Sequence, residues 1–125
     1  MHKTLRALAA ATALSFAGLP EAEAERLDGC AGIKMFMGSS TGTLLVPDDP
    51  TVARVLASGR RRMAVHAEDE ERLKERFALV AGGASVAQHP VWRDARCALL
   101  ATQRVLRLAR EARRPVHILH VTTAE

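Results

Sequence analysis

The sequence predicts an α/β protein in which about three buried parallel strands are joined by crossover helices. Three short, mostly apolar runs indicate the strands, at 33–37, 63–67 and 116–121. Since these runs carry few polar residues, they are typical of parallel strands that are covered on both faces. Segments with helical spacing of apolar residues lie between them, and a chain of 125 residues has the size of one small domain.

Turn and cap residues bound the first strand and the helix after it. The run 33–37 precedes a glycine-bounded loop, Gly38–Gly42. That loop could cradle a phosphate, but it lacks the ending of a phosphate-binding loop, so a plain connection is favoured. Asp49 is expected to cap the next helix, because Pro50 suits the first helical position, and Gly59 is expected to end it.

The second strand, 63–67, leads into a charged helix expected over 68–80, and the segment from there to Pro90 is expected to be loop. This helix is expected to bury three residues on one face: Leu73, Phe77 and Val80. A longer helix is expected over 92–113, ended by Pro115. Its expected buried face repeats at steps of three and four: Ala95, Ala98, Leu99, Thr102, Leu106 and Ala109.

Residues 1–24 form an Ala-rich segment with the features of a secretion signal. A basic start precedes the apolar stretch 7–19, and Ala22–Ala24 has the pattern of a cleavage site. The same residues also fit a plain helix that ends near Gly18. We expect a cytoplasmic protein whose domain covers 25–125, with export as the alternative. The apolar stretch is too short to span a membrane.

Composition narrows the function classes further. Aromatic residues make up 3% of the chain and Tyr is absent, which argues against a nucleic-acid module that stacks bases on aromatic side chains. The net charge of +4 is modest, and the basic run Arg60–Arg62 is expected to be solvated. Cys30 and Cys97 form no metal or disulfide motif, so both are expected to be reduced, small and buried.

Each of the three expected strands carries a polar residue that a buried strand should avoid: Lys34, His66 and His120. A single residue of this kind, such as His117, is more often a satisfied core side chain or a strand end. Three near the carboxyl ends of parallel strands, where sites form, indicate a metal centre. Imidazole suits Zn²⁺, Co²⁺ or Fe²⁺. A neutral lysine that has reacted with CO₂ would add an anionic ligand with two oxygens.

Four segments in order resemble motifs of the dihydroorotases, cyclic amidohydrolases of the metal-dependent amidohydrolase superfamily. Gly29–Gly42 resembles their fourth-strand motif and 65–70 their fifth-strand motif. The segment 89–94 is similar to the following loop and helix start, and 117–123 to the sixth strand. The resemblance covers 25–125.

The resemblance implies a section of a (β/α)₈ TIM barrel. It implies Lys34 as a carboxylated lysine that bridges two Zn²⁺ ions, and His66 and His120 as imidazole ligands. It also implies a cyclic amide substrate, with interconversion of N-carbamoyl-aspartate and dihydroorotate in pyrimidine biosynthesis. It further implies that the chain assembles with copies of itself or with a carbamoyltransferase.

The chain also departs from the family pattern. It contains no His-x-His pair, which the family carries on its first strand, and no catalytic residue is assigned because the family's eighth-strand Asp is absent. Thr122–Glu125 is a capping box with no helix after it. We therefore expect a truncated, inactive fragment. The alternatives are a dihydropyrimidinase- or allantoinase-type enzyme and a non-catalytic partner subunit.

Overall fold

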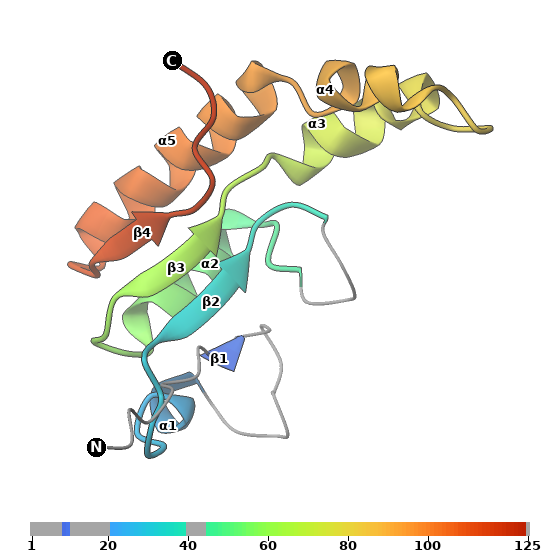
Figure 1. Ribbon diagram of the computed structural model, residues 1–125. Coiled ribbons are helices and arrows are strands. Elements are labelled where there is room, and N and C mark those ends of the chain that lie inside the picture. Colours follow the sequence, from blue (N-terminus) through green and yellow to red (C-terminus); the bar gives the residue numbers. More distant parts are fainter. Residues whose placement is uncertain (1–8, 11–20, 40–44, 125) are drawn as a thin grey trace.

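The computed structural model describes residues 9–10, 21–39 and 45–124. Its centre is a parallel four-stranded sheet whose strands lie in chain order (Figure 1). The strands are β1 (Ala9–Ala10), β2 (Ile33–Phe36), β3 (Met63–His66) and β4 (Val116–Ile118). The α/β class and the three expected strands are confirmed.

The short strand β1 was not expected from the sequence. Ala9–Ala10 pairs in parallel with the start of β2, so these two residues are extended rather than helical. The rest of the signal-like segment up to residue 20 lies outside the described residues, as do 40–44 of the glycine-bounded loop. Within the described ranges, no helix has the length and apolar character needed to cross a bilayer.

The helices are α1 (Glu21–Ala24), α2 (Asp49–Ala57), α3 (Glu70–Glu75), α4 (His89–Trp92) and α5 (Ala95–Glu111). Two single 3₁₀ turns, η1 (Phe77–Leu79) and η2 (Val86–Gln88), lie between α3 and α4. The expected loop up to Pro90 therefore contains η2 and the start of α4, whereas η1 lies within the segment 68–80 expected as one helix. Gly82 and Gly83 turn the chain there at φ of 74° and 81°, a region that favours glycine.

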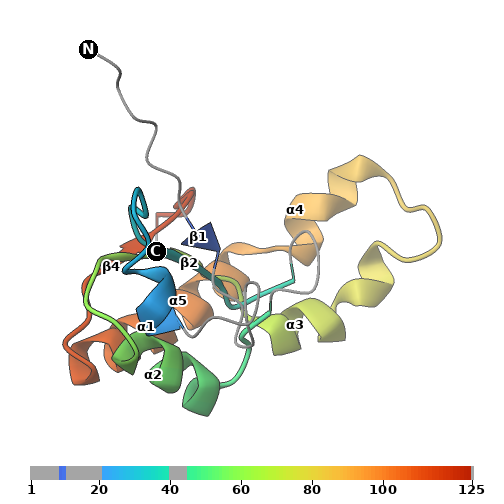
Figure 2. The ribbon, with the colours of Figure 1, turned by 90° about the horizontal axis from the view of Figure 1, so that it is seen from below.

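The core lies between one face of the sheet and helices α2 and α5, which lie on the same side of the strands (Figure 2). The strands contribute buried residues at alternate positions, and each helix contributes one apolar stripe. These residues are Ile33, Met35, Met63 and Val65 from the sheet, Val52, Val55 and Leu56 from α2, and Ala101, Val105 and Leu108 from α5. Because successive side chains of a strand alternate between faces, the polar strand residues lie on the other face of the sheet.

The residue that caps α2 differs from the expected one by a single position. The Asp48 side chain accepts the Thr51 N–H at 2.8 Å, so Asp48 and not Asp49 is the N-cap. Asp49 lies in the first turn, where its carboxylate pairs with Arg104 and Arg107 of α5. The two helices are thus joined by ion pairs as well as by the core.

Helix α5 buries a different face from the expected one. Its buried residues are Cys97, Ala101, Val105, Leu108 and Ala109. Of the expected stripe only Ala109 is buried, and Leu106 is 45% exposed. In the charged segment before it, Leu73 is buried as expected, but α3 ends at Glu75 and Phe77 is 55% exposed.

A buried ion pair closes the end of the sheet where the strands begin. Glu25, just after α1, pairs with Arg114, and both are buried although they lie 89 residues apart. Glu25 also accepts the Arg60 N–H at 2.9 Å. The side chains of Arg60–Arg62 are exposed as expected, and both cysteines are free and buried as expected.

Candidate metal centre

The register of the sheet places the polar strand residues on the face that α2 and α5 leave uncovered. Lys34 pairs with Ala64, and Phe36 pairs with His66. Partners on neighbouring parallel strands share a face, and successive residues alternate between faces. Lys34, Phe36 and His66 therefore lie opposite the buried residues of β2.

The two predicted imidazole ligands meet at the carboxyl ends of β3 and β4. His66 Nδ1 lies 2.9 Å from His120 Nε2, and the ring centroids are 4.8 Å apart. The Leu119 N–H donates to the Val65 carbonyl at 3.0 Å, which continues the strand pairing beyond β4. His120 then adopts a left-handed backbone with φ of 41°. His66 is buried, whereas His120 is exposed.

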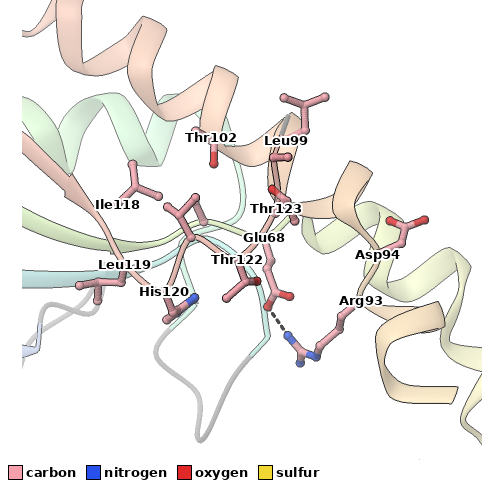
Figure 3. Close-up of a pocket in the computed structure, with 14 residues that line it drawn as sticks. Glu68, Arg93, Asp94, Leu99, Thr102, Ile118, Leu119, His120, Thr122 and Thr123 are labelled. Atoms are coloured by element: carbon pink, nitrogen blue, oxygen red, sulfur yellow. Dashed lines mark hydrogen bonds and ion pairs between the residues drawn. The ribbon is translucent and has the colours of Figure 1, made fainter. Parts of the chain in front are cut away.

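A carboxylate lies on the other side of the His66 ring. His66 Nε2 is 2.7 Å from Glu68 Oε2, and Glu68 is paired in turn with Arg93 (Figure 3). Burial tends to raise the pKa of Glu68, but the contacts with His66 and Arg93 outweigh it and hold that pKa below its ordinary value. Arg93 also donates to the Ser39 carbonyl at 2.7 Å, which links the segments after β2 and β3.

Lys34 lies one strand away from the imidazole pair. Its Nζ is 4.1 Å from the centroid of the Phe36 ring, and the Phe36 and His66 rings are 5.8 Å apart. The ammonium group therefore rests on an aromatic face. Burial lowers the pKa of Lys34 to about 8, which enriches the neutral amine that reacts with CO₂.

The donor set fits part of a metal centre. Two ring nitrogens face one another, and the remaining nitrogen of His66 is next to a carboxylate, as is usual for histidines that bind metals. Within the part of the chain that the structure describes, no three His, Cys, Asp or Glu side chains form a metal-binding group by themselves. A bound ion would therefore need a further ligand such as Lys34.

A pocket of about 370 Å³ opens beside this cluster (Figure 3). It lies between the end of β4, the segment that follows it and the start of α5. The segment after β3, the start of α5 with the residues just before it, and the segment after β4 contribute its polar lining: Glu68, Arg93, Asp94, Thr102, His120, Thr122 and Thr123. It offers both hydroxyl and charged groups next to the imidazole pair.

Sequence reasoning did not single out the residues that support the histidines. Glu68 and Arg93 are examples, and Glu70 is another, since its carboxylate accepts both the N–H and the hydroxyl of Ser39. The acidic run 68–70, which directly follows a buried strand, is a sequence feature that could have indicated Glu68 and Glu70. The sequence identified Gly38 only as a turn residue. In the structure a Cβ at this position would lie 2.7 Å from the Glu68 carbonyl oxygen, so the close approach requires glycine.

Comparison with known proteins finds structural neighbours among the hydantoinases and dihydropyrimidinases. No protein-family model and no curated protein matches the chain. A solved D-hydantoinase is 31% identical with a TM-score of 0.65 over 74% of this chain. A dihydropyrimidinase from Brevibacillus agri is 26% identical with a TM-score of 0.67 over 78% of this chain. The L-hydantoinase (dihydropyrimidinase) from Arthrobacter aurescens is also 26% identical, with a TM-score of 0.64 over 74%.

The likeness covers only part of those proteins. The chain spans 21% of the D-hydantoinase and 22% of each of the other two. Another D-hydantoinase matches 92% of the chain with a TM-score of 0.75, but at 23% identity it supports the fold alone. The neighbours support the expected class of cyclic amidohydrolases, but they do not show the narrower expectation of a dihydroorotase. The chain is thus similar in structure to a part of the D-hydantoinases and dihydropyrimidinases, which are cyclic amidohydrolases of the amidohydrolase superfamily.

Proposed function

We propose that the chain supplies part of the metal centre of a cyclic amidohydrolase of the hydantoinase or dihydropyrimidinase type. The observation that carries this proposal is the 2.9 Å approach of His66 Nδ1 to His120 Nε2 at the carboxyl ends of adjacent parallel strands. Two such nitrogens can bind one ion, and sites in parallel α/β proteins form at this end of the strands.

Three residues of the chain would hold the metal. His66 would bind through Nδ1 and His120 through Nε2, and Lys34, once carboxylated at Nζ, would offer two oxygens from the neighbouring strand. Nitrogen and oxygen donors of this kind suit Zn²⁺. A bound zinc ion would act as a Lewis acid toward a cyclic amide carbonyl. The chain's own part is to orient the imidazoles and to shield the His66 ring with Phe36 and the Glu68–Arg93 pair.

The fold supports a section of a (β/α)₈ barrel. All described strand pairs are parallel and follow chain order, and α2 and α5 cover one face of the sheet. In a barrel the uncovered face, with Lys34 and His66, would line the interior. The solved neighbours support the same assignment.

The names of the neighbours favour a hydantoin or a dihydropyrimidine ring as the substrate class. Dihydroorotate is the second candidate, because Gly29–Gly42 resembles the fourth-strand motif of dihydroorotases. All three substrates contain a cyclic amide C–N bond.

The test is calorimetric titration of the chain with Zn²⁺ in bicarbonate buffer. We expect one site in the unmodified chain and a loss of at least tenfold in affinity in both His66→Ala and His120→Ala. Lys34→Ala should also weaken binding. His89→Ala is the matched control, since His89 is exposed on α4 and not on the sheet, and it should leave the affinity unchanged. Equal affinities in His66→Ala and the unmodified chain would overturn the proposal.

A further inference from the structure

Four side chains form a continuous line of contacts beside the imidazole pair: Arg93, Glu68, His66 and His120. The line joins the segment before α5 to the ends of β3 and β4. The side chains of Arg93, Glu68 and His66 are at most 17% exposed, so water screens their contacts only weakly. These contacts can therefore fix the geometry of the rings.

We infer that Glu68 is a positioning residue that holds His66 by its Nε2–H, so that Nδ1 is directed at His120 and at a metal. The inference rests on the proposed function for the metal, whereas the contact between Glu68 and His66 is a property of the chain itself.

Elementary hydrogen-bond chemistry gives the direction of this contact. A neutral imidazole has one donor nitrogen and one acceptor nitrogen, and an ionised carboxylate can only accept. Nε2 faces the Glu68 carboxylate, so Nε2 carries the proton and Nδ1 keeps the lone pair. In the described part of the chain Nε2 is buried and has no hydrogen bond of regular geometry, so Glu68, 2.7 Å away, is the group that can satisfy it.

Arg93 pairs with the same Glu68 oxygen that faces His66. Its guanidinium pairs with Glu68 Oε2, donates to the Ser39 carbonyl at 2.7 Å and lies 4.5 Å from the centroid of the Trp92 ring. With its charge compensated in this way, Glu68 stays in place as an acceptor for His66. The segment after β2 thereby helps to orient a histidine of β3.

The experiment has two readouts on the full chain. The first is the NMR signal of the His66 Nε2 proton at a pH of about 8, where an unperturbed imidazole is neutral. The second is Zn²⁺ affinity. We expect the ring proton in the unmodified chain and in Glu68→Gln, whose amide oxygen still accepts. Glu68→Ala should lose the signal and bind Zn²⁺ roughly 10- to 100-fold more weakly. Glu71→Gln, an exposed change in the first turn of α3, is the matched control.

Different failures have different meanings. A ring proton in the unmodified chain without Zn²⁺ binding would contradict the proposed function and support the positioning contact. No ring proton in the unmodified chain, or equal Zn²⁺ affinity in Glu68→Ala, would overturn the inference. Should Glu68→Ala not fold, Glu68→Asp decides, because it keeps the charge for Arg93 and withdraws the acceptor from Nε2. An unchanged signal and affinity in that variant would also overturn it.

Discussion

At the scale of single residues, the backbone angle φ of His120 places its imidazole next to the imidazole of His66. His120 lies two residues beyond the end of β4 with φ of 41°, in a region that few residues other than glycine, Asn, Asp and His occupy. Its ring nitrogen therefore meets His66 on the neighbouring strand. Strain of this kind is common where a side chain has a functional task.

Gly38 is a residue on which the site's geometry depends. A Cβ at Gly38 would lie 2.7 Å from the Glu68 carbonyl oxygen, so Gly38→Ala should separate the ends of β2 and β3. We expect it to destabilise the chain by about 1–3 kcal/mol and to weaken Zn²⁺ binding. Gly59→Ala is the control, since its Cβ would crowd the Glu25–Arg114 pair, away from the site. Urea unfolding and Zn²⁺ titration check both variants, and equal Zn²⁺ losses would contradict this explanation.

Asp94 predicts a pH dependence of stability. Its carboxylate accepts the Cys97 N–H that caps α5 and pairs with Arg72, and the Arg72 hydrogen bond is the largest cause that lowers its pKa to about 2. Because the folded pKa lies below that of the unfolded chain, the stabilisation is complete above pH ~4 and is lost as the pH falls toward 2.

The variant Asp94→Asn keeps the cap and removes the charge. We expect it to be less stable than the unmodified chain at neutral pH, with the difference in unfolding free energy shrinking on acidification. Urea unfolding across this range measures the difference. A gap that does not change with pH would show that the charge of Asp94 contributes nothing.

The sequence could indicate the candidate metal ligands but not the residues that contact them. Lys34, His66 and His120 stand out because a polar residue in an apolar run is costly without a purpose. Glu68 does not, because an acidic residue before a helix is also ordinary dipole and cap chemistry. The placement of Lys34 over Phe36 depends on side-chain packing, which a linear pattern does not contain.

At the scale of elements, α5 shows why a helix can be predicted while its buried face is not. Small and apolar residues lie on two overlapping stripes, and either has helical spacing. Packing against α2 and the sheet selects the stripe with Ala101 and Val105. The other stripe, with Leu99 and Thr102, borders the pocket instead.

Two alanine substitutions separate these stripes. Val105 is fully buried and Leu106 is 45% exposed. We expect Val105→Ala to lower the free energy of unfolding by about 2 kcal/mol and Leu106→Ala by no more than ~0.5 kcal/mol. Thermal and urea unfolding measure both. A larger loss of unfolding free energy in Leu106→Ala than in Val105→Ala would instead support the buried face of α5 that the sequence predicted.

At the scale of the whole molecule, the sheet has one covered face and one uncovered face in the residues that the structure describes. Within these residues no strand pairs with the outer edge of β4, and Val121 beside it is 67% exposed. The sequence predicted this parallel arrangement from its alternating strands and helices. It missed β1, since two alanines in an Ala-rich stretch carry no strand signal of their own.

An unpaired strand edge and exposed apolar residues predict self-association. We expect the sedimentation coefficient of the isolated chain to rise with concentration. Val121→Glu should reduce that rise without lowering the melting temperature, because it adds a charge to an exposed position. A chain that sediments as a monomer at every concentration would contradict this expectation.

The most direct test of the metal centre is diffraction at the zinc edge from crystals of the chain grown with Zn²⁺. We expect an anomalous peak at about 2.0–2.1 Å from both His66 Nδ1 and His120 Nε2. Zinc bound only elsewhere, with the two rings still hydrogen-bonded to each other, would contradict it.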